Sequence, residues 1–382
     1  MELDLDPEQE ELRDGVRAVL AAECSPAVVR DLVDARVAGK DARPDALWSQ
    51  MIALGWSALT VPEAAGGLGL GAVEEAVVIE ELGRALAPGP LLPTMTQFVP
   101  AVCAAGSAEQ QDRFLRPVAE QGAAGTLALA EASGAFAPEA VTVVATPDAA
   151  GGYTLVGDKH HVFEPSMAEE IVVVARLPET TGAEGVGAFV VPSESVEIRP
   201  VAGLDPTREL ATVALTGVTV PGDRVLGDPG PATAAALRGA IEESTVALAA
   251  SAVGTAQGVF DMTLAYAKER EQFGAPIGSF QAIKHKFADM LVLLERARAL
   301  VLFAALTIAE DDPRRTTAAS MAKAAAGDAI ERIAQEGIQI HGGIGYTWEH
   351  DVHLSVRRLQ SDGVLFGSAT AHRATVADLL GV

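Results

Sequence analysis

Positive charge is scarce in this sequence of 382 residues. It contains 28 lysine and arginine residues against 52 aspartate and glutamate residues, which gives a formal net charge of −24. Proteins that bind nucleic acids or anionic membranes need clustered positive charge to displace the counterions of phosphate groups. The composition therefore argues against a nucleic-acid-binding protein and against a protein of anionic membrane surfaces.

Cysteine is scarcer still, because the sequence has only Cys24 and Cys103. Two cysteines cannot form a disulfide framework, and neither lies in a CxxC or Cys/His pattern with metal-ligand spacing. The N-terminal sequence Met-Glu-Leu-Asp-Leu-Asp-Pro is acidic, and it lacks the basic start and the apolar stretch of a signal peptide. We therefore expect two buried or half-buried thiols in a cytoplasmic protein.

Metal ligands and membrane spans are not indicated either. The histidine pairs lack acidic or sulfur partners at ligand spacing, so we expect surface or interface histidines and no metal site at His160, His161, His350 and His353. The most apolar segment, residues 245–267, is long enough to span a bilayer but contains scattered polar residues. We interpret it as a helix that is buried on most sides inside a bundle.

The order of local patterns predicts a mainly α protein with a middle β domain. Apolar residues repeat at helical spacing up to about residue 120, and short runs rich in Val and Thr follow from about residue 125. Beyond the Gly- and Pro-rich linker at residues 227–231, helices are predicted at about 232–269, 280–310, 315–340 and 350–380. We therefore divide the chain into an N-terminal helical domain (1–122), a middle β domain (123–230) and a C-terminal helical bundle (231–382).

Two motifs in the C-terminal part could carry chemistry. The first is Arg270-Glu271-Gln272-Phe273-Gly274, followed by Ile277-Gly278-Ser279-Phe280-Gln281, and the second is Gln339-Ile340-His341-Gly342-Gly343-Ile344-Gly345-Tyr346. A Gly-rich loop lets backbone N–H groups approach a phosphate closely, and a guanidinium can hold a diphosphate. Taken alone, Gly342 and Gly343 could equally be a helix C-cap and Arg270 a charge favoured by the helix dipole.

Together, and in this order, the two motifs closely resemble those of the acyl-CoA dehydrogenase family, and the resemblance runs over the whole chain. It implies an N-terminal helical domain, a β-barrel-like middle domain and a C-terminal four-helix bundle, with FAD shared at a subunit interface. It also implies which residues reach the FAD that the neighbouring subunit mainly binds: Arg270, Phe273, Gln281, Gln339, Gly342 and Gly343. The implied substrate is an acyl-CoA thioester, and the implied electron acceptor is an electron-transfer flavoprotein.

The family's reaction is α,β-dehydrogenation, in which a Glu carboxylate removes the α-proton and the β-hydrogen leaves as hydride to the flavin. Counting from Gly342 and Gly343 places Phe366 at the usual position of this Glu. A minority of the family carries the Glu on the helix before the first motif instead, and that position falls at Ser244. Neither side chain can accept the proton, so we predict no catalytic residue in this chain. Glu243 and Asp362 lie nearby in sequence, but we expect both to be solvated charges rather than displaced bases.

The middle domain departs from the family as well. Where the family has hydrogen-bonding motifs for the isoalloxazine ring, this sequence reads Ala130-Glu131-Ala132-Ser133-Gly134-Ala135-Phe136 and His161-Val162-Phe163-Glu164. Ala130 and Phe163 replace hydroxyl donors, and Phe163 adds bulk where a flavin ring would lie. The part of the site for the flavin ring is therefore predicted to be lost, while the part for the diphosphate and adenosine is predicted to be retained.

This combination favours the subunit that lacks the catalytic Glu in a heteromeric acyl-CoA dehydrogenase. We expect a heterotetramer with a Glu-bearing subunit as the partner. Two alternatives remain open. One is a self-sufficient homotetramer with a displaced base, and the other is a flavin monooxygenase built on the same fold. The sequence does not define the acyl group, although two-subunit members of the family act on bulky thioesters such as those of steroid side chains.

Overall fold

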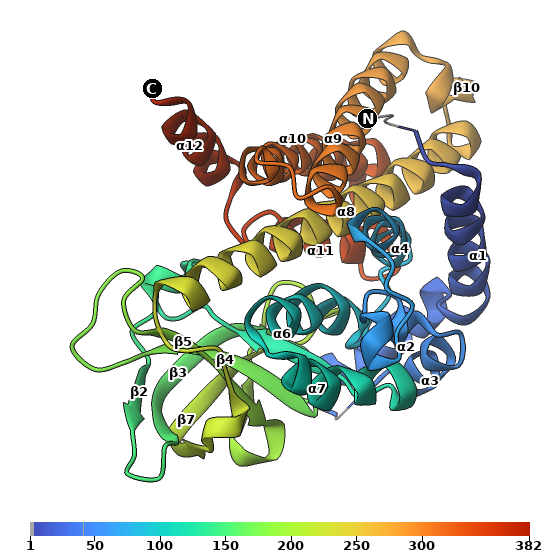
Figure 1. Cartoon of the computed structure of the whole chain (residues 1–382). Coiled ribbons are helices and arrows are strands. Elements are labelled where there is room, and N and C mark those ends of the chain that lie inside the picture. Colours follow the sequence, from blue (N-terminus) through green and yellow to red (C-terminus); the bar gives the residue numbers. More distant parts are fainter. Residues whose placement is uncertain (1–3, 41) are drawn as a thin grey trace.

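The computed structural model describes residues 4–40 and 42–382. The first three residues of the acidic N-terminal stretch therefore lie outside the described part. A layer of helices precedes a β sheet, and a bundle of long helices follows it (Figure 1). The predicted fold class, mainly α with a middle β domain and similar to the acyl-CoA dehydrogenase fold, is confirmed.

The N-terminal helices begin with strong local signals. Asp6 caps the first helix in a reciprocal capping box with Gln9, and Pro7 occupies the first helical position. Ser107 and Gln110 form the same arrangement on the last helix of this layer. The helices are α1 (Pro7–Glu23), α2 (Pro26–Val37), α3 (Asp45–Ala53), α4 (Ala72–Arg84), α5 (Leu91–Pro93), α6 (Val99–Ala105) and α7 (Ala108–Gln121), with a π-helical turn at Thr94–Phe98 between α5 and α6.

Eight strands of the described chain form one mixed sheet in the order β6-β7-β3-β2-β4-β5-β8, and β1 pairs with β4 in parallel. Buried Val, Ala and Phe residues occupy most of β4 and β5, which is the pattern of strands covered on both faces. The strands are β1 (Gly125–Ala128), β2 (Val144–Pro147), β3 (Tyr153–Phe163), β4 (Glu170–Arg176), β5 (Val186–Pro192), β6 (Glu197–Pro200), β7 (Leu210–Val220) and β8 (Val225–Leu226).

The C-terminal bundle is built around α8 (Pro231–Glu269), which crosses the whole molecule (Figure 1). A short hairpin, β9 (Glu271–Gln272) and β10 (Ala275–Pro276), joins it to α9 (Gln281–Ala309), and α10 (Arg315–His341) packs on both helices. The apolar segment 245–267 lies in α8 and is mostly buried, as predicted. Among residues 4–40 and 42–382, no helix has both the length and the apolar character that a bilayer span requires.

The last part of the chain corrects one prediction. Residues 350–380 were expected to form one helix, but they form α11 (Val352–Asp362) and α12 (Ala369–Leu380). Phe366 and Gly367 between them adopt positive φ angles of 55° and 100°, and Ser368 caps α12. A backbone in this left-handed region cannot continue a right-handed helix, so the chain turns at Phe366.

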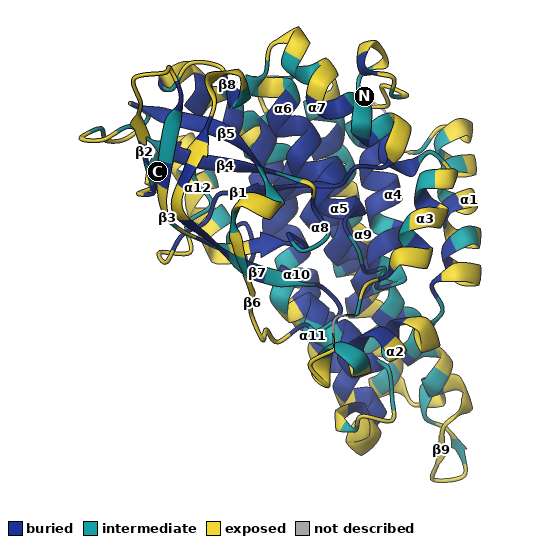
Figure 2. Cartoon of the chain, turned by 90° about the horizontal axis from the view of Figure 1, so that it is seen from below, coloured by how far each residue is buried: buried dark blue, intermediate teal, exposed yellow. Residues whose placement is uncertain are grey.

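The N-terminal layer meets the bundle through close backbone contact between α4 and α8. A Cβ built on Gly254 would lie 1.8 Å from the carbonyl oxygen of Glu80, and one built on Gly83 would lie 2.0 Å from that of Ser251. Only glycine permits such an approach at these positions. As a result α4 and the middle of α8 form the buried centre of the molecule (Figure 2).

Candidate functional site

The first cofactor motif lies on an exposed hairpin at the end of α8. Phe273 and Gly274 form the two-residue turn between β9 and β10, with φ angles of 55° and 79°. This pair of positive angles is typical of the tight turns that suit hairpins, but it is unfavourable for a bulky residue. The Phe273 side chain is nevertheless 96% exposed, and the hairpin projects from the molecule (Figure 2). An exposed aromatic held in a strained turn indicates a contact with another molecule.

The second motif lies beside the first. Gln339 is exposed on the last turn of α10, and Gly342 and Gly343 begin a 3₁₀ turn at Gly342–Tyr346. A Cβ built on either glycine would meet nothing within 4 Å, so their backbone borders open space. The two motifs are joined where the Tyr266 ring stacks on His341 with centroids 4.6 Å apart, and the Tyr266 hydroxyl donates to the His341 carbonyl at 3.4 Å.

The donors on this surface can hold an anionic group. The Arg270 side chain is exposed, and among the described residues its guanidinium has no hydrogen-bond or ion-pair partner. The Gln281 amide, also exposed, lies 2.9 Å from the imidazole Nε2 of His285. All six residues assigned to the cofactor are thus exposed, three of them on the connection between α8 and α9 or at its ends, and the other three at the end of α10 and in the turn after it. A spare guanidinium and an amide are donors of the kind that bind a diphosphate such as that of FAD, whereas the Gly342 N–H already donates to the Ile338 carbonyl.

The region predicted to face the flavin ring is filled by aromatic side chains of the chain itself. Phe366 stacks on Phe136 with ring centroids 4.5 Å apart, and its centroid lies 6.0 Å from that of Phe163. Phe366 is 5% exposed and Phe163 is 1% exposed. These three side chains, which we call the Phe cluster, come from the two altered middle-domain stretches and from the position of the missing Glu. An isoalloxazine ring could not occupy the space that these three side chains fill.

Buried ion pairs lie next to the Phe cluster. The Arg208 guanidinium carbon lies 5.1 Å from the centroid of the Phe163 ring, and Arg208 Nη1 donates to Asp362 Oδ1 at 2.5 Å. Arg358 Nε donates to Asp205 Oδ2 at 2.6 Å, and Lys323 Nζ donates to the Asp362 carbonyl. The expectation that Asp362 is solvated is therefore wrong, because it is 0% exposed and paired. A carboxylate that is ion-paired with arginine is not free to take up a proton from a substrate, as a displaced base would have to.

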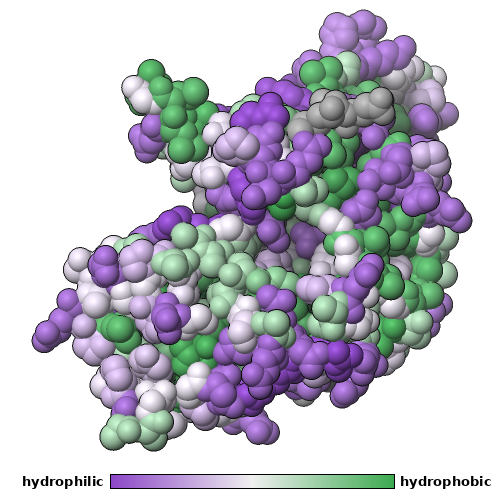
Figure 3. Space-filling model, viewed as in Figure 1, coloured by the Kyte–Doolittle hydropathy of each residue, from purple (hydrophilic) through white to green (hydrophobic). Residues whose placement is uncertain are grey.

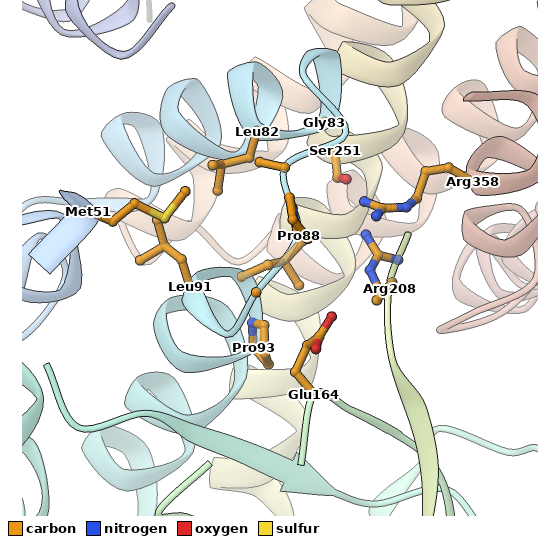
Figure 4. A pocket seen from close by; sticks show the side chains of 13 residues that line it. Met51, Leu82, Gly83, Pro88, Leu91, Pro93, Glu164, Arg208, Ser251 and Arg358 are labelled. Atoms are coloured by element: carbon orange, nitrogen blue, oxygen red, sulfur yellow. The ribbon is translucent and has the colours of Figure 1, made fainter. Parts of the chain in front are cut away.

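Figure 4 shows the cavity beside these ion pairs, between α8 and the end of α4. Arg208, Arg358 and Glu164 approach it from one side and Leu82, Pro88 and Leu91 from the other. Its volume is about 10 Å³, which is the space of about one water molecule. Burial raises the pKa of Glu164, although Arg36 at 3.4 Å opposes this shift. This cavity is too small for an acyl chain.

Ser244, which sequence counting places at the alternative base position, has its hydroxyl hydrogen-bonded within the protein. The Ser244 hydroxyl is buried, 2.7 Å from the Thr96 carbonyl oxygen and 2.9 Å from that of Ala240. Glu243 points elsewhere, toward Arg315 at 3.4 Å, and burial raises its pKa. Its side chain is 29% exposed, so it is an ion-paired rather than a fully solvated group.

Sequence reasoning missed several buried polar groups. Burial and the neighbouring Glu243 raise the pKa of Glu75 on α4 well above its ordinary value. His353 is 7% exposed, which corrects the expectation of a surface histidine. Glu131, which matches a family motif, accepts hydrogen bonds from Lys159 at 2.6 Å and from the Val143 backbone at 3.0 Å. In the described part of the chain, no group of three or more His, Cys, Asp or Glu side chains is placed to hold a metal ion.

Comparison with known proteins defines the family. The model for the N-terminal domain of acyl-CoA dehydrogenases matches residues 6–122, and the model for their C-terminal domain matches residues 234–381. The chain is 36% identical over 362 residues to acyl-CoA dehydrogenase IpdE2 of Mycobacterium tuberculosis, covering 94% of this chain and 93% of that protein. The chain therefore belongs to the acyl-CoA dehydrogenase family, whose members are FAD-dependent oxidoreductases acting on CH–CH groups.

Solved structures of similar proteins match the fold of this chain over nearly its whole length. The ChsE4–ChsE5 complex from Mycobacterium tuberculosis contains a chain that is 26% identical with a TM-score of 0.88, covering 100% of this chain and 99% of that one. A steroid acyl-CoA dehydrogenase described as Tcur3481–Tcur3483, in a G363A variant, is 29% identical with a TM-score of 0.84 and covers 98% of both chains. The two cofactor motifs and the Phe cluster thus lie in a chain whose overall fold matches that of these solved structures.

Proposed function

We propose that this chain is the non-catalytic subunit of a heteromeric, FAD-dependent acyl-CoA dehydrogenase. Its exposed loops complete the FAD site of a Glu-bearing partner subunit, which removes the α-proton of an acyl-CoA thioester. The observation that carries this proposal is the contrast between the two parts of the site. The Phe cluster closes the place of the flavin ring, while all six residues for the remainder of the cofactor are exposed.

The chain's own residues have defined roles in this proposal. Bound FAD supplies the acceptor for the β-hydrogen in the partner's site. Arg270 would donate to its diphosphate, the open backbone at Gly342 and Gly343 would let the diphosphate approach closely, and Phe273 would pack against the cofactor from the hairpin. The spare donors of Arg270 and the openness around both glycines support these roles.

Self-sufficient catalysis would need a base and a flavin-ring pocket in this chain. The two candidate carboxylates form ion pairs, Asp362 with Arg208 and Glu243 with Arg315. The ring pocket is closed by Phe136 and Phe366. A monooxygenase would also need a usable flavin-ring pocket, so the same cluster argues against that alternative.

Exposed apolar surface supports an oligomer. Every residue of α12 is at least partly exposed, and hydrophobic side chains lie on this protruding helix (Figure 3). Leu379 is 51% exposed and Leu380 is 70% exposed. Contiguous apolar surface of this kind marks an interaction site. The ChsE4–ChsE5 complex is itself named as an assembly of two proteins, which supports a heteromer.

The likeness to a protein described as a steroid acyl-CoA dehydrogenase supports a bulky acyl group as the substrate of the assembly. An electron-transfer flavoprotein is the proposed electron acceptor, and the cytoplasm is the proposed location. The electron acceptor follows from membership of the family, and the location follows from the scarcity of cysteine.

Co-expression tests the proposal. The chain is produced alone and together with a Glu-bearing acyl-CoA dehydrogenase subunit, for which the neighbouring genes are the first candidates. We expect the chain alone to purify without flavin colour, and the complex to contain one FAD per two chains and to reduce an artificial acceptor with acyl-CoA. One FAD per chain and thioester oxidation by the chain alone would overturn the proposal, and oxygen-dependent hydroxylation would favour the monooxygenase.

A matched pair of variants locates the interface within the complex. Arg270→Ala removes the spare guanidinium, and we expect it to weaken FAD binding by about ten- to a hundredfold, because charge-assisted hydrogen bonds contribute about 1.5–3 kcal/mol. Arg113→Ala serves as the control, since Arg113 lies on α7, outside the two cofactor motifs, and pairs with Asp223. Equal FAD affinity in both variants would exclude the role assigned to Arg270.

A further inference from the structure

Two cavities adjoin where the N-terminal helices meet the bundle, away from the residues assigned to FAD. The first has a volume of about 350 Å³ and lies between the α1–α2 junction, α4, α8 and α11. The second has a volume of about 270 Å³ and lies between α1, α4, α8 and α9. Arg17, Glu81 and Arg84 line both cavities, so these three side chains form their common wall.

The first cavity is predominantly apolar. Its walls include side chains that are 8% exposed or less, namely Leu20, Cys24, Val29, Leu86 and Leu354. Burial raises the pKa of the Cys24 thiol to about 11, so the thiol is neutral at physiological pH. A cavity of this size and character suits the apolar body of a small molecule, because ligand pockets range from about 300 to 1,000 Å³.

The second cavity is rich in guanidinium groups. Arg13, Arg17, Arg84 and Arg298 line it, against only two lining carboxylates, Glu80 and Glu81. Each of these arginines also pairs with at least one carboxylate, and Arg84 does so through a single nitrogen, with Asp261. An anionic group would therefore be held here by unused guanidinium donors and not by a net positive charge.

The common wall holds the donors that remain unused. Arg298 is fully engaged, because its three nitrogens donate to Glu80, Glu295 and Gln257. Arg84, in contrast, donates only from Nη2, to Asp261 at 2.6 Å, which leaves Nε and Nη1 without an acceptor among the described residues. Arg17 uses Nε and Nη2 for Glu81. Arg84 therefore offers spare charged donors at the boundary between the first and the second cavity.

We propose that the two cavities form a binding site for an amphipathic organic anion. The apolar body of the ligand lies in the first cavity, and its single carboxylate accepts hydrogen bonds from Arg84 and Arg17 at the common wall. A medium-length fatty or alicyclic carboxylate has this chemistry. The site is separate from the FAD surface and from the Phe cluster, since none of their residues line either cavity. It would allow a free acid to bind the subunit that carries no base.

The two cysteines give a direct assay with an internal control. Cys24 lines the first cavity, whereas Cys103 does not line either one and has its pKa raised by burial to about 12. Alkylation by N-ethylmaleimide at alkaline pH is followed for each cysteine by mass spectrometry, with the full chain and increasing sodium decanoate. We expect decanoate to slow alkylation of Cys24 in a saturable manner and to leave the rate at Cys103 unchanged.

Two pairs of variants test the two parts of the site. Ala21→Trp fills the entrance of the first cavity from an exposed helix position, and Ala22→Trp on the same helix is its control, because Ala22 does not line the cavity. Arg84→Gln replaces the charged guanidinium by a shorter, neutral amide, with Arg113→Gln as control. We expect Ala21→Trp to abolish protection and Arg84→Gln to weaken decanoate binding about tenfold, as the loss of a charge-assisted hydrogen bond implies. Calorimetric titration with decanoate measures the affinities independently of the thiol.

Three results would overturn the proposal. The first is the absence of both protection and calorimetric binding by decanoate in a chain with a normal thermal midpoint. The second is equal decanoate binding by Ala21→Trp and Ala22→Trp. The third is equal binding of decanoate and 1-decanol together with unchanged affinity in Arg84→Gln, because the anionic head would then contribute nothing.

Discussion

Replacing Phe366 by glutamate tests whether the missing base alone explains the predicted inactivity. Phe366 is 5% exposed and stacks on Phe136 at 4.5 Å. Removing a buried phenylalanine ring costs about 3–5 kcal/mol in other proteins, because the loss of packing leaves a cavity. A glutamate carboxyl in this apolar surrounding stays protonated or costs further free energy, so it does not recover the loss.

The expected loss can be converted to a thermal shift. With an unfolding entropy of about 2.1 cal/mol/K per residue, the 382-residue chain has a total of about 0.8 kcal/mol/K. A loss of about 4 kcal/mol then lowers the midpoint of a cooperative transition by about 5 °C. Phe366→Leu is the matched control, which keeps a large apolar side chain; the smaller loss of buried carbon atoms predicts a cost of about 1.5 kcal/mol and a shift of about 2 °C.

The assays are differential scanning calorimetry, flavin absorbance and acyl-CoA-dependent reduction of an artificial acceptor, all with the chain alone. We expect Phe366→Glu to be less stable than Phe366→Leu, colourless and inactive, because a carboxyl at this position does not reopen the place of the flavin ring. Bound FAD and thioester oxidation by the Phe366→Glu chain would refute the reasoning, and so would equal midpoints for the two variants.

Three further predictions concern the buried polar groups and the helix contact. Asp362→Asn breaks the ion pair with Arg208 and should cost about 3–5 kcal/mol in unfolding free energy, whereas the double change Arg208→Met/Asp362→Leu should recover most of it in calorimetry. Burial lowers the pKa of Lys323 from 10.5 to about 8, so wild-type stability should rise between pH 8 and 10.5, where the unfolded chain binds the extra proton. The stability advantage of Lys323→Met in urea titrations should therefore shrink over this interval by up to about 3 kcal/mol. Gly254→Ala should cost about 1–3 kcal/mol because α4 and α8 must separate, while Gly239→Ala on the same helix, with its nearest neighbour at 3.6 Å, should be neutral or stabilising in thermal unfolding.

The order of helices and strands could be predicted because each element carries its own periodic pattern and end signals. The Asp6–Gln9 capping box and the Val-rich strands are local features that need no knowledge of the fold. The break between α11 and α12 was missed although Gly363, Gly367 and Ser368 were visible in the sequence. Their meaning depends on the left-handed backbone at Phe366, which the packing of its ring on Phe136 stabilises.

The exposed cofactor motifs could be located from the sequence because the residues of each motif are close along the chain. The buried ion pairs could not, since Arg208 and Asp362 are 154 positions apart and no local pattern links them. The same reason explains why Asp362 was expected in solvent. Burial of a charge is decided by the partner that the tertiary structure brings to it, and propensity carries no information about that partner.

The proposed separation of a closed flavin-ring pocket from an open cofactor surface has a structural basis. The cofactor loops end the helices α8 and α10 and are fixed by their own hairpin and by the Tyr266–His341 stack. They make no use of the Phe cluster, so substitutions at Phe136, Phe163 and Phe366 leave their geometry unaffected. Charge follows the same division, because residues 260–382 carry a net charge of −2 (13 − 15) and residues 1–259 carry −22 (15 − 37). An anionic cofactor that belongs to a partner can therefore approach the near-neutral end of this chain without meeting the acidic domains. This arrangement suits a subunit that completes the FAD site of another chain and needs no complete FAD site of its own.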